Sequence, residues 1–282
     1  MSYAGFYINL DRSTDRRAEI EGEIARYGLT DRYRRFSAAD GNVLGFPNPH
    51  LSSAEMGCFT SHLLLLQENI GSPLHLHIVE DDAIFSRFTA PVVELMAGSD
   101  GIEQYDVLFT ETFITPLNLD FKKCKEMYDS GVERDPAGAV MNVRPSIINH
   151  VAGTSSYIVN RRSIEKLADH FMRVLKGGAP VNIDLIIREA TRENIIRSGC
   201  IFPFVTSIRL DGVTNNTISG RKHDTLTEVL AGMGRYSFFV DCDHRALCEC
   251  AARLLPLPEG DMHNRLLGHL LAFSVTDKFH PF

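Results

Sequence analysis

Short apolar runs alternate along the chain with longer segments in which apolar residues recur at helical spacing. The runs typical of buried strands cover residues 4–10, 35–41, 74–80, 105–110, 151–159 and 200–208. Helices are predicted between them, at residues 16–27, 52–69, 91–97, 163–176 and 182–196. Such a strand–helix alternation predicts an α/β fold with a mainly parallel central sheet flanked by helices.

Two stretches lack the strand pattern and suggest how the chain is divided. Residues 115–150 carry scattered Gly and Pro and are predicted to form a long irregular loop, which in a compact domain is often a functional lid or acceptor loop. A polar loop is predicted at 211–224, and the pattern after it is helical. We therefore expect a main domain over residues 1–224 and a helical C-terminal extension packed on it over residues 225–282.

Three consecutive acids, Glu80, Asp81 and Asp82, follow the apolar run at 74–80. Like charges at the end of a buried strand repel one another, so a cation is expected among them. Glu80 and Asp82 share a face in an extended segment and together can hold one hard divalent cation, with positions left for water and phosphate oxygens. The alternative is an acidic loop in which Asp82 caps the next helix.

A second candidate group lies on the helix that begins with an S-x-x-E capping box at residues 52–55. Glu55, Cys58 and His62 fall on one stripe of this helix, and Ser61 is adjacent. A Glu–His pair that faces the acids could orient substrate hydroxyls. Alternatively, Glu55 only completes its capping box and His62 is a structural residue.

Asn9 and Leu10 stand at the end of the first predicted strand, just before three arginines. Arg12, or the nearby Arg16 and Arg17, could bind phosphate oxygens in a forked contact. The pattern equally fits an alternative in which these arginines are solvated charges at the start of a helix.

Composition and charge argue against a nucleic-acid-binding, membrane-spanning or secreted protein. The 282 residues carry a net charge of −7 without a Lys/Arg block, so no nucleic-acid partner is expected. No apolar stretch approaches the ~20 residues that cross a bilayer, and the N-terminus lacks the pattern of a signal peptide, which predicts a cytoplasmic location. Cys242, Cys248 and Cys250 lack C-x-x-C spacing and are interpreted as small apolar residues rather than metal ligands.

Four blocks in order resemble glycosyltransferase family 25, which includes bacterial lipooligosaccharide galactosyltransferases and collagen galactosyltransferases. They are Ile8–Ser13, Phe36–Gly41, Glu55–His62 and Val79–Ala83. Weaker similarity at 153–159, 182–184 and 216–220 extends the resemblance over about residues 3–222.

The resemblance implies a GT-A-like fold, a UDP-sugar donor with galactose as the first candidate, and a glycan or glycolipid acceptor such as lipooligosaccharide. It also implies inversion at the anomeric carbon and a divalent cation, Mn²⁺ or alternatively Mg²⁺, held by Asp82 and Glu80. A lipid-linked acceptor would add a peripheral contact with the inner membrane. Donor contacts are then expected from Asn9, Leu10, Arg12, Ala38, Asp40, Gly41, Glu55, Ser61, His62, Glu80 and Asp81.

The acceptor hydroxyl needs a base, because an alcohol is a poor nucleophile near neutral pH. Asp184, at a predicted helix start, is the first candidate, although it could equally be a helix cap; Glu111, after the strand at 105–110, is the second. His223 is a candidate late metal ligand by position. The rival functions are a metal-dependent phosphohydrolase or nucleotidyltransferase that uses the same acids, and a non-catalytic sugar-binding relative.

Overall fold

The computed structural model describes residues 2–45, 48–114, 121–209, 226–243 and 245–247. Within these residues a seven-stranded sheet forms the centre, in the order β2-β1-β3-β9-β5-β10-β8. Its strands are β1 (Tyr3–Asn9), β2 (Tyr33–Ser37), β3 (His75–Glu80), β5 (Val107–Phe109), β8 (Ser146–Ile148), β9 (Ser156–Val159) and β10 (Ser198–Phe202).

Most strands of this sheet run in one direction. β2, β1 and β3 are parallel neighbours, as are β5 and β10. β9 is inserted antiparallel between β3 and β5, and β8 is antiparallel at the edge. The predicted mainly parallel α/β sheet is therefore confirmed. Because β9 runs the opposite way, its beginning lies at the same edge as the carboxyl ends of β3 and β5.

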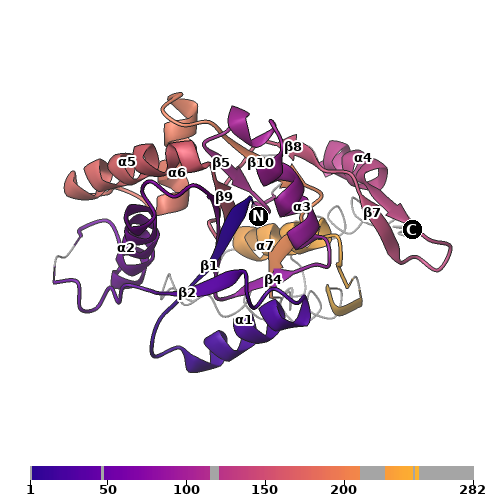
Figure 1. Cartoon of the computed structure of the whole chain (residues 1–282), viewed down its shortest axis with the longest axis horizontal. Coiled ribbons are helices and arrows are strands. Elements are labelled where there is room, and N and C mark those ends of the chain that lie inside the picture. Colours follow the sequence, from indigo (N-terminus) through magenta and orange to yellow (C-terminus); the bar gives the residue numbers. More distant parts are fainter. Residues whose placement is uncertain (1, 46–47, 115–120, 210–225, 244, 248–282) are drawn as a thin grey trace, which may run out of the picture.

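Helices cover both faces of the sheet, and Figure 1 shows α1 and the α5–α6 pair on opposite sides of the strands. One apolar core packs the sheet against α2, α4, α5, α6 and α7, and the other packs it against α1 and α3. The helices are α1 (Thr14–Arg26), α2 (Ser53–Glu68), α3 (Thr89–Gly98), α4 (Phe121–Gly131), α5 (Ile164–Lys176), α6 (Ile183–Arg192) and α7 (Leu226–Ser237), with short 3₁₀ turns η1 (Ile102–Gln104) and η2 (Arg161–Ser163).

The alternation of side chains along β3 explains why this strand is buried on both faces. Leu76 and Ile78 pack in the core beneath α2 and α5, whereas Val79 packs in the core beneath α1 and α3. A strand buried on both faces needs an apolar or satisfied residue at every position. Glu80 is the last residue of the strand, so the first charge appears where the strand leaves the interior.

The prediction of an irregular loop over residues 115–150 was wrong. The segment contains α4, a hairpin of β6 (Val132–Arg134) and β7 (Val140–Val143), and the edge strand β8. Of the two glycines that suggested a loop, Gly131 is the last residue of α4, and Gly138, at φ +88°, lies in the turn between β6 and β7. Residues 115–120 lie outside the described residues.

The alternative in which Asp82 caps a helix was also wrong. The acidic turn leads directly into a short strand, β4 (Ala83–Phe85), which pairs antiparallel with β11 (Thr206–Ile208). The next helix, α3, begins only at Thr89. The acids are therefore held in a tight turn between two strands.

The described part of the C-terminal segment packs on the main core. Tyr236 and Phe238 belong to the same apolar core as α2, and the Phe204 backbone exchanges hydrogen bonds with Phe238 and Val240. The division at residue 224 stays a prediction, since residues 210–225 and 248–282, with His223, Cys248 and Cys250, lie outside the described residues. In the described part of the chain, no helix combines the length and apolar character that membrane crossing requires.

Candidate functional site

In the acidic turn at the carboxyl end of β3, Asp81 and Asp82 pair with the same arginine. Arg16 of α1 lies 2.6 Å from Asp81 Oδ1 and 3.1 Å from Asp82 Oδ2. Asp82 Oδ1 is buried and has no hydrogen-bond partner among the described residues. Burial, followed by the charge of Glu80, raises the pKa of Asp82 to about 6. A buried carboxylate oxygen without a partner is costly, so this turn fits a bound cation.

Asp81 turns toward the end of β1. The Asn9 side-chain amide donates a 2.7 Å hydrogen bond to Asp81 Oδ2, and Arg35 donates to the Asn9 side-chain oxygen at 3.2 Å. Burial raises the pKa of Asp81, although Arg16 and Asn9 oppose this effect. Asn9 itself is almost fully buried. It therefore fixes the acidic turn to β1.

Glu80 faces α2. Its Oε1 lies 3.5 Å from His62 Nε2 and accepts a 2.8 Å hydrogen bond from the Thr154 hydroxyl. The other ring nitrogen, His62 Nδ1, lies 2.7 Å from the Tyr157 hydroxyl. Burial alone would raise the pKa of Glu80, but His62 and Thr154 outweigh it and hold the pKa below its usual value. Glu80 is therefore an ionised, oriented carboxylate.

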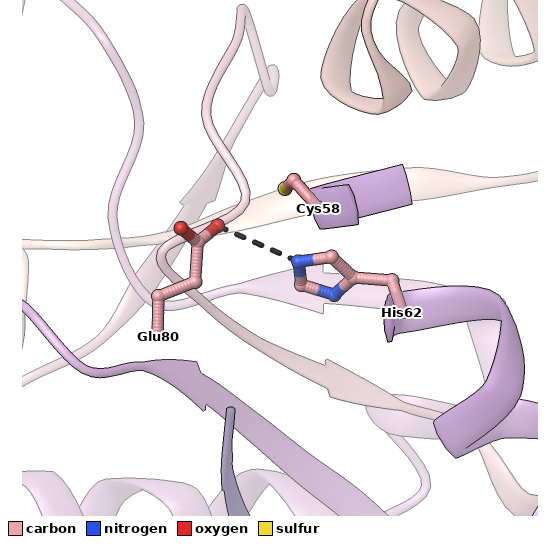
Figure 2. Close-up of side chains that lie close together, drawn as sticks. All are labelled: Cys58, His62 and Glu80. Atoms are coloured by element: carbon pink, nitrogen blue, oxygen red, sulfur yellow. Dashed lines mark ion pairs between the residues drawn. The ribbon is translucent and has the colours of Figure 1, made fainter. Parts of the chain in front are cut away.

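Cys58 joins this pair from the preceding turn of α2. Figure 2 shows the tips of Cys58, His62 and Glu80 converging, and their ligand atoms all lie within 4.8 Å of one another. Burial raises the pKa of the Cys58 thiol well above its ordinary value, and the charge of Glu80 adds to this. Without a cation nearby, the thiol is protonated and is not a nucleophile.

Asp184 lies in the first turn of α6 and reaches the same edge of the sheet. Its Oδ2 accepts the backbone N–H of Gly153 at 3.0 Å, and its Oδ1 accepts that of Leu185 at 2.9 Å. Gly153 has φ +97°, a conformation that favours glycine. Burial raises the pKa of Asp184 despite these hydrogen bonds, and the charge of Glu80 contributes. Asp184 thus holds the segment that leads into β9.

Glu111, two residues after β5, is engaged in a buried ion pair with Arg235 of α7. Arg235 Nη1 lies 2.9 Å from Glu111 Oε2 and 3.1 Å from the Ser155 hydroxyl, and the guanidinium stacks 4.4 Å above the Phe113 ring. The two charged side chains are 1% and 4% exposed. Burial raises the pKa of Glu111, and the charge of Arg235 opposes it. The pair therefore connects α7 to the edge of the sheet at which the acidic turn lies.

The turn after β2 is fixed against the N-terminal half of α2. The Ala39 N–H donates to the Ser61 hydroxyl at 2.9 Å, and Ser61 donates to the Gly57 carbonyl at 2.6 Å. Ala38 N–H donates to the Asn9 carbonyl at 3.0 Å, so this turn lies beside the end of β1. The predicted donor-binding residues Asn9, Ala38 and Ser61 are therefore brought together.

Three other predicted residues have different partners. Arg12 pairs with Asp40 on the exposed side of this turn, whereas Arg16 contacts the acids. Glu55 completes the capping box, since its carboxylate accepts the Ser52 N–H at 2.7 Å. Leu10 is half-buried beside β1, and its carbonyl accepts the Ser13 N–H.

Sequence reasoning missed several residues that complete the arrangement. Thr154 and Tyr157 lie in the 153–159 stretch that carried part of the family resemblance, and that stretch could have pointed to them. Arg235 had no local signal, because only the packing of α7 brings it to Glu111.

Comparison with known proteins gives a family match and a distant likeness to solved structures. The family model described as glycosyltransferase family 25 (LPS biosynthesis protein) matches residues 4–187, which is more than half of the chain. No curated protein matches significantly. Among solved structures, the galactosyltransferase LgtC in complex with donor and acceptor sugar analogues matches with a TM-score of 0.37 at 12% identity, covering 91% of this chain and 98% of that one.

Proposed function

Because the chain belongs to glycosyltransferase family 25, we propose that it is a GT-A-like enzyme that transfers a sugar from a UDP-sugar to an acceptor hydroxyl. The first candidate sugar is galactose, and the acceptor is a glycan or glycolipid of the lipooligosaccharide class. An acceptor of this kind would bring the enzyme to the cytoplasmic surface of the inner membrane. The observation that carries the proposal is the buried, unpartnered Oδ1 of Asp82 in the acidic turn. Ligands of open α/β sheets bind outside the carboxyl ends of strands, where this turn lies.

Asp82 and Glu80 would hold a divalent cation, Mn²⁺ or alternatively Mg²⁺. Both offer carboxylate oxygens, which these hard cations prefer. The unpartnered oxygen of Asp82 and its raised pKa support this assignment. When bound, the cation neutralises charge that develops on the leaving diphosphate.

The surrounding residues hold the acids in position, and the neighbouring turn offers a contact surface for the donor. Asn9 fixes Asp81, while His62 and Thr154 fix Glu80. Such supporting hydrogen bonds keep a binding group within the narrow range of geometry that catalysis requires. The turn of Ala38–Gly41, beside the end of β1, is the proposed contact for the nucleoside, and Arg16 is an additional cation next to the diphosphate position.

Asp184 is the proposed general base for a single displacement with inversion. It lies at the edge that contains Glu80, and burial raises its pKa, which makes its carboxylate a stronger base. Glu111, the second candidate, is in a buried ion pair with Arg235, so its protonation would leave the charge of Arg235 buried without a partner. This pairing favours Asp184.

The decisive experiment incubates the full chain with Mn²⁺ and a panel of UDP-sugars, with and without a lipooligosaccharide acceptor, and measures both UDP and glycosylated product. Asp82→Asn is expected to abolish transfer while the fold is retained, as judged by circular dichroism. Asp129→Asn, an exposed acid on α4, is the matched control and should keep full activity. Retained transfer in Asp82→Asn would exclude the metal assignment. Release of UMP and sugar 1-phosphate from the UDP-sugar, without sugar transfer, would instead support the phosphohydrolase alternative.

A further inference from the structure

A set of mixed donor atoms lies next to the all-oxygen acidic turn. Cys58 and His62 are one turn apart on α2, and both point at Glu80 (Figure 2). His62 Nε2 and Glu80 Oε1 are 3.5 Å apart. Ligand atoms around a tetrahedral Zn²⁺, at bond lengths of about 2.0–2.3 Å, are separated by roughly 3.3–3.8 Å. The three ligand atoms lie within 4.8 Å of one another, so each would have to approach its neighbours by about 1 Å at most to reach these distances.

We propose that Cys58, His62 and Glu80 form a Zn²⁺ site with three protein ligands and an open fourth position. A thiolate sulfur, an imidazole nitrogen and a carboxylate oxygen together suit a borderline-soft cation, whereas Mn²⁺ and Mg²⁺ prefer oxygen ligands alone. The site therefore differs in chemical class from the pair of Glu80 and Asp82 proposed for the hard cation.

The neighbouring contacts resemble those that orient metal ligands. The Tyr157 hydroxyl, 2.7 Å from His62 Nδ1, anchors the ring by one nitrogen and leaves Nε2 facing Cys58 and Glu80. Thr154 holds the Glu80 carboxylate at 2.8 Å. A histidine that binds metal through one nitrogen almost always uses the other for such a hydrogen bond.

Access and charge are also suitable. The His62 side chain is only 1% exposed, but that of Glu80 is 17% exposed, which gives an ion a route to the site. Asp82 and Asp184 act electrostatically on Cys58 together with Glu80, so the local charge is negative and attracts a cation.

Glu80 belongs to both sets of ligands, which has a consequence for activity that rests on the proposed function. A cation bound to Glu80 reduces the negative charge that attracts a second one, so bound Zn²⁺ would weaken the binding of Mn²⁺. The zinc site itself does not depend on that function, and its test uses no turnover.

Co²⁺ is the probe for the site, because thiolate ligation gives a near-ultraviolet charge-transfer band and four-coordinate geometry gives intense visible bands. The titration uses the full chain with Cys242, Cys248 and Cys250 replaced by Ser, so that C-terminal thiols cannot contribute. Both sets of bands are expected, and one equivalent of Zn²⁺ should remove them. Cys58→Ser should lose the charge-transfer band, whereas Cys124→Ala, which alters a thiol buried in the core, should keep it.

Two further variants keep the test informative if Cys58→Ser does not fold. Glu80→Gln keeps the thiol and is expected to shift the visible bands, and Tyr157→Phe should keep the bands but weaken Zn²⁺ binding about tenfold. Circular dichroism confirms that each variant is folded. Absence of both bands at saturating Co²⁺, or an unchanged charge-transfer band in folded Cys58→Ser, would overturn the proposal. An inactive enzyme with an intact cobalt spectrum would count only against the proposed function.

Discussion

Gly57 of α2 packs directly against the backbone of Gly41, so closely that a β-carbon at position 57 would lie 2.8 Å from the Gly41 nitrogen. The same β-carbon would lie 2.7 Å from the Ala39 carbonyl oxygen. These are backbone atoms, which cannot rotate away as the end of a side chain can. The contact holds the proposed nucleoside-binding turn against α2, and α2 also carries Cys58 and His62.

Gly57→Ala should therefore destabilise the protein by about 1–3 kcal/mol, the usual cost of overpacking. Gly22→Ala is the matched control, because Gly22 is also helical but a β-carbon there meets nothing within 4 Å. It should stabilise the protein by about 0.5–1 kcal/mol, since Gly is unfavourable in a helix interior. Urea unfolding measures both changes. Equal stability of the two variants would contradict the packing argument.

The burial of His77 leads us to expect that the protein loses stability in mild acid. The ring is fully buried in β3, between the Tyr33 hydroxyl at 2.5 Å and the Ser156 hydroxyl at 3.0 Å, and burial lowers its pKa from 6.5 to about 3. Between these values the unfolded chain binds one more proton than the folded protein, so the free energy of unfolding falls as pH falls. The slope from this group is roughly 1 kcal/mol per pH unit.

His77→Gln removes this titration and should give a shallower decline in the free energy of unfolding from pH 6 to pH 4. Above pH 7 both proteins carry a neutral side chain at this position, so their curves should run parallel there. Urea unfolding at each pH measures the two curves. Parallel curves down to pH 4 would show that His77 does not cause the acid sensitivity.

The ion pair of Glu111 and Arg235 predicts strong coupling between α7 and the rest of the molecule. Arg235→Met leaves a buried carboxylate without its partner and should cost about 3–5 kcal/mol. The double variant Glu111→Leu with Arg235→Met removes both charges and should recover most of that loss. A double-mutant cycle by chemical unfolding measures the coupling. Arg26→Met, at an exposed arginine on α1, is the control and should change little. Additive effects of the two substitutions would show that the pair does not act as a unit.

The parts of the site that could be predicted from sequence depend on local signals. Three acids after an apolar run mark the end of a strand, and the S-x-x-E pattern at residues 52–55 marks the start of α2; the structure confirms both. Helical spacing then placed Cys58 and His62 on one face of α2. Each of these inferences needs only neighbours within a few positions along the chain.

The missed parts depend on contacts between distant segments. The turn after Asp82 becomes a strand because β11 pairs with it, and more than 100 residues separate the two strands. Arg235 and Glu111, which form the buried ion pair, are 124 positions apart in the sequence. Local propensity does not determine such pairings, because the side chains that stabilise them are far away in the chain. The Gly and Pro at 115–150 misled because they separate short elements: β6 and β7 form a local hairpin, whereas β8 pairs with the distant strand β10.

Asp184 and Glu111 can be separated as candidate bases by comparing chemistry with donor binding. If Asp184 removes the acceptor proton, Asp184→Asn should lower kcat about 10²- to 10⁴-fold, with the affinity for the UDP-sugar largely unchanged. Glu111→Gln should instead lower stability more than kcat, because it leaves Arg235 buried without a carboxylate partner. Calorimetry measures donor binding, and initial rates with saturating acceptor measure kcat.

The structural role of Asp184 sets the control for this comparison. Its carboxylate accepts two backbone N–H groups, from Gly153 and Leu185, and an Asn side chain has only one oxygen to accept them. Some loss of thermal stability is therefore expected in Asp184→Asn, and it should appear without a change in donor affinity. If donor binding is lost together with transfer, Asp184 acts by holding the segment of Gly153 and Thr154 beside Glu80. If kcat falls in Glu111→Gln but not in Asp184→Asn, the base is Glu111.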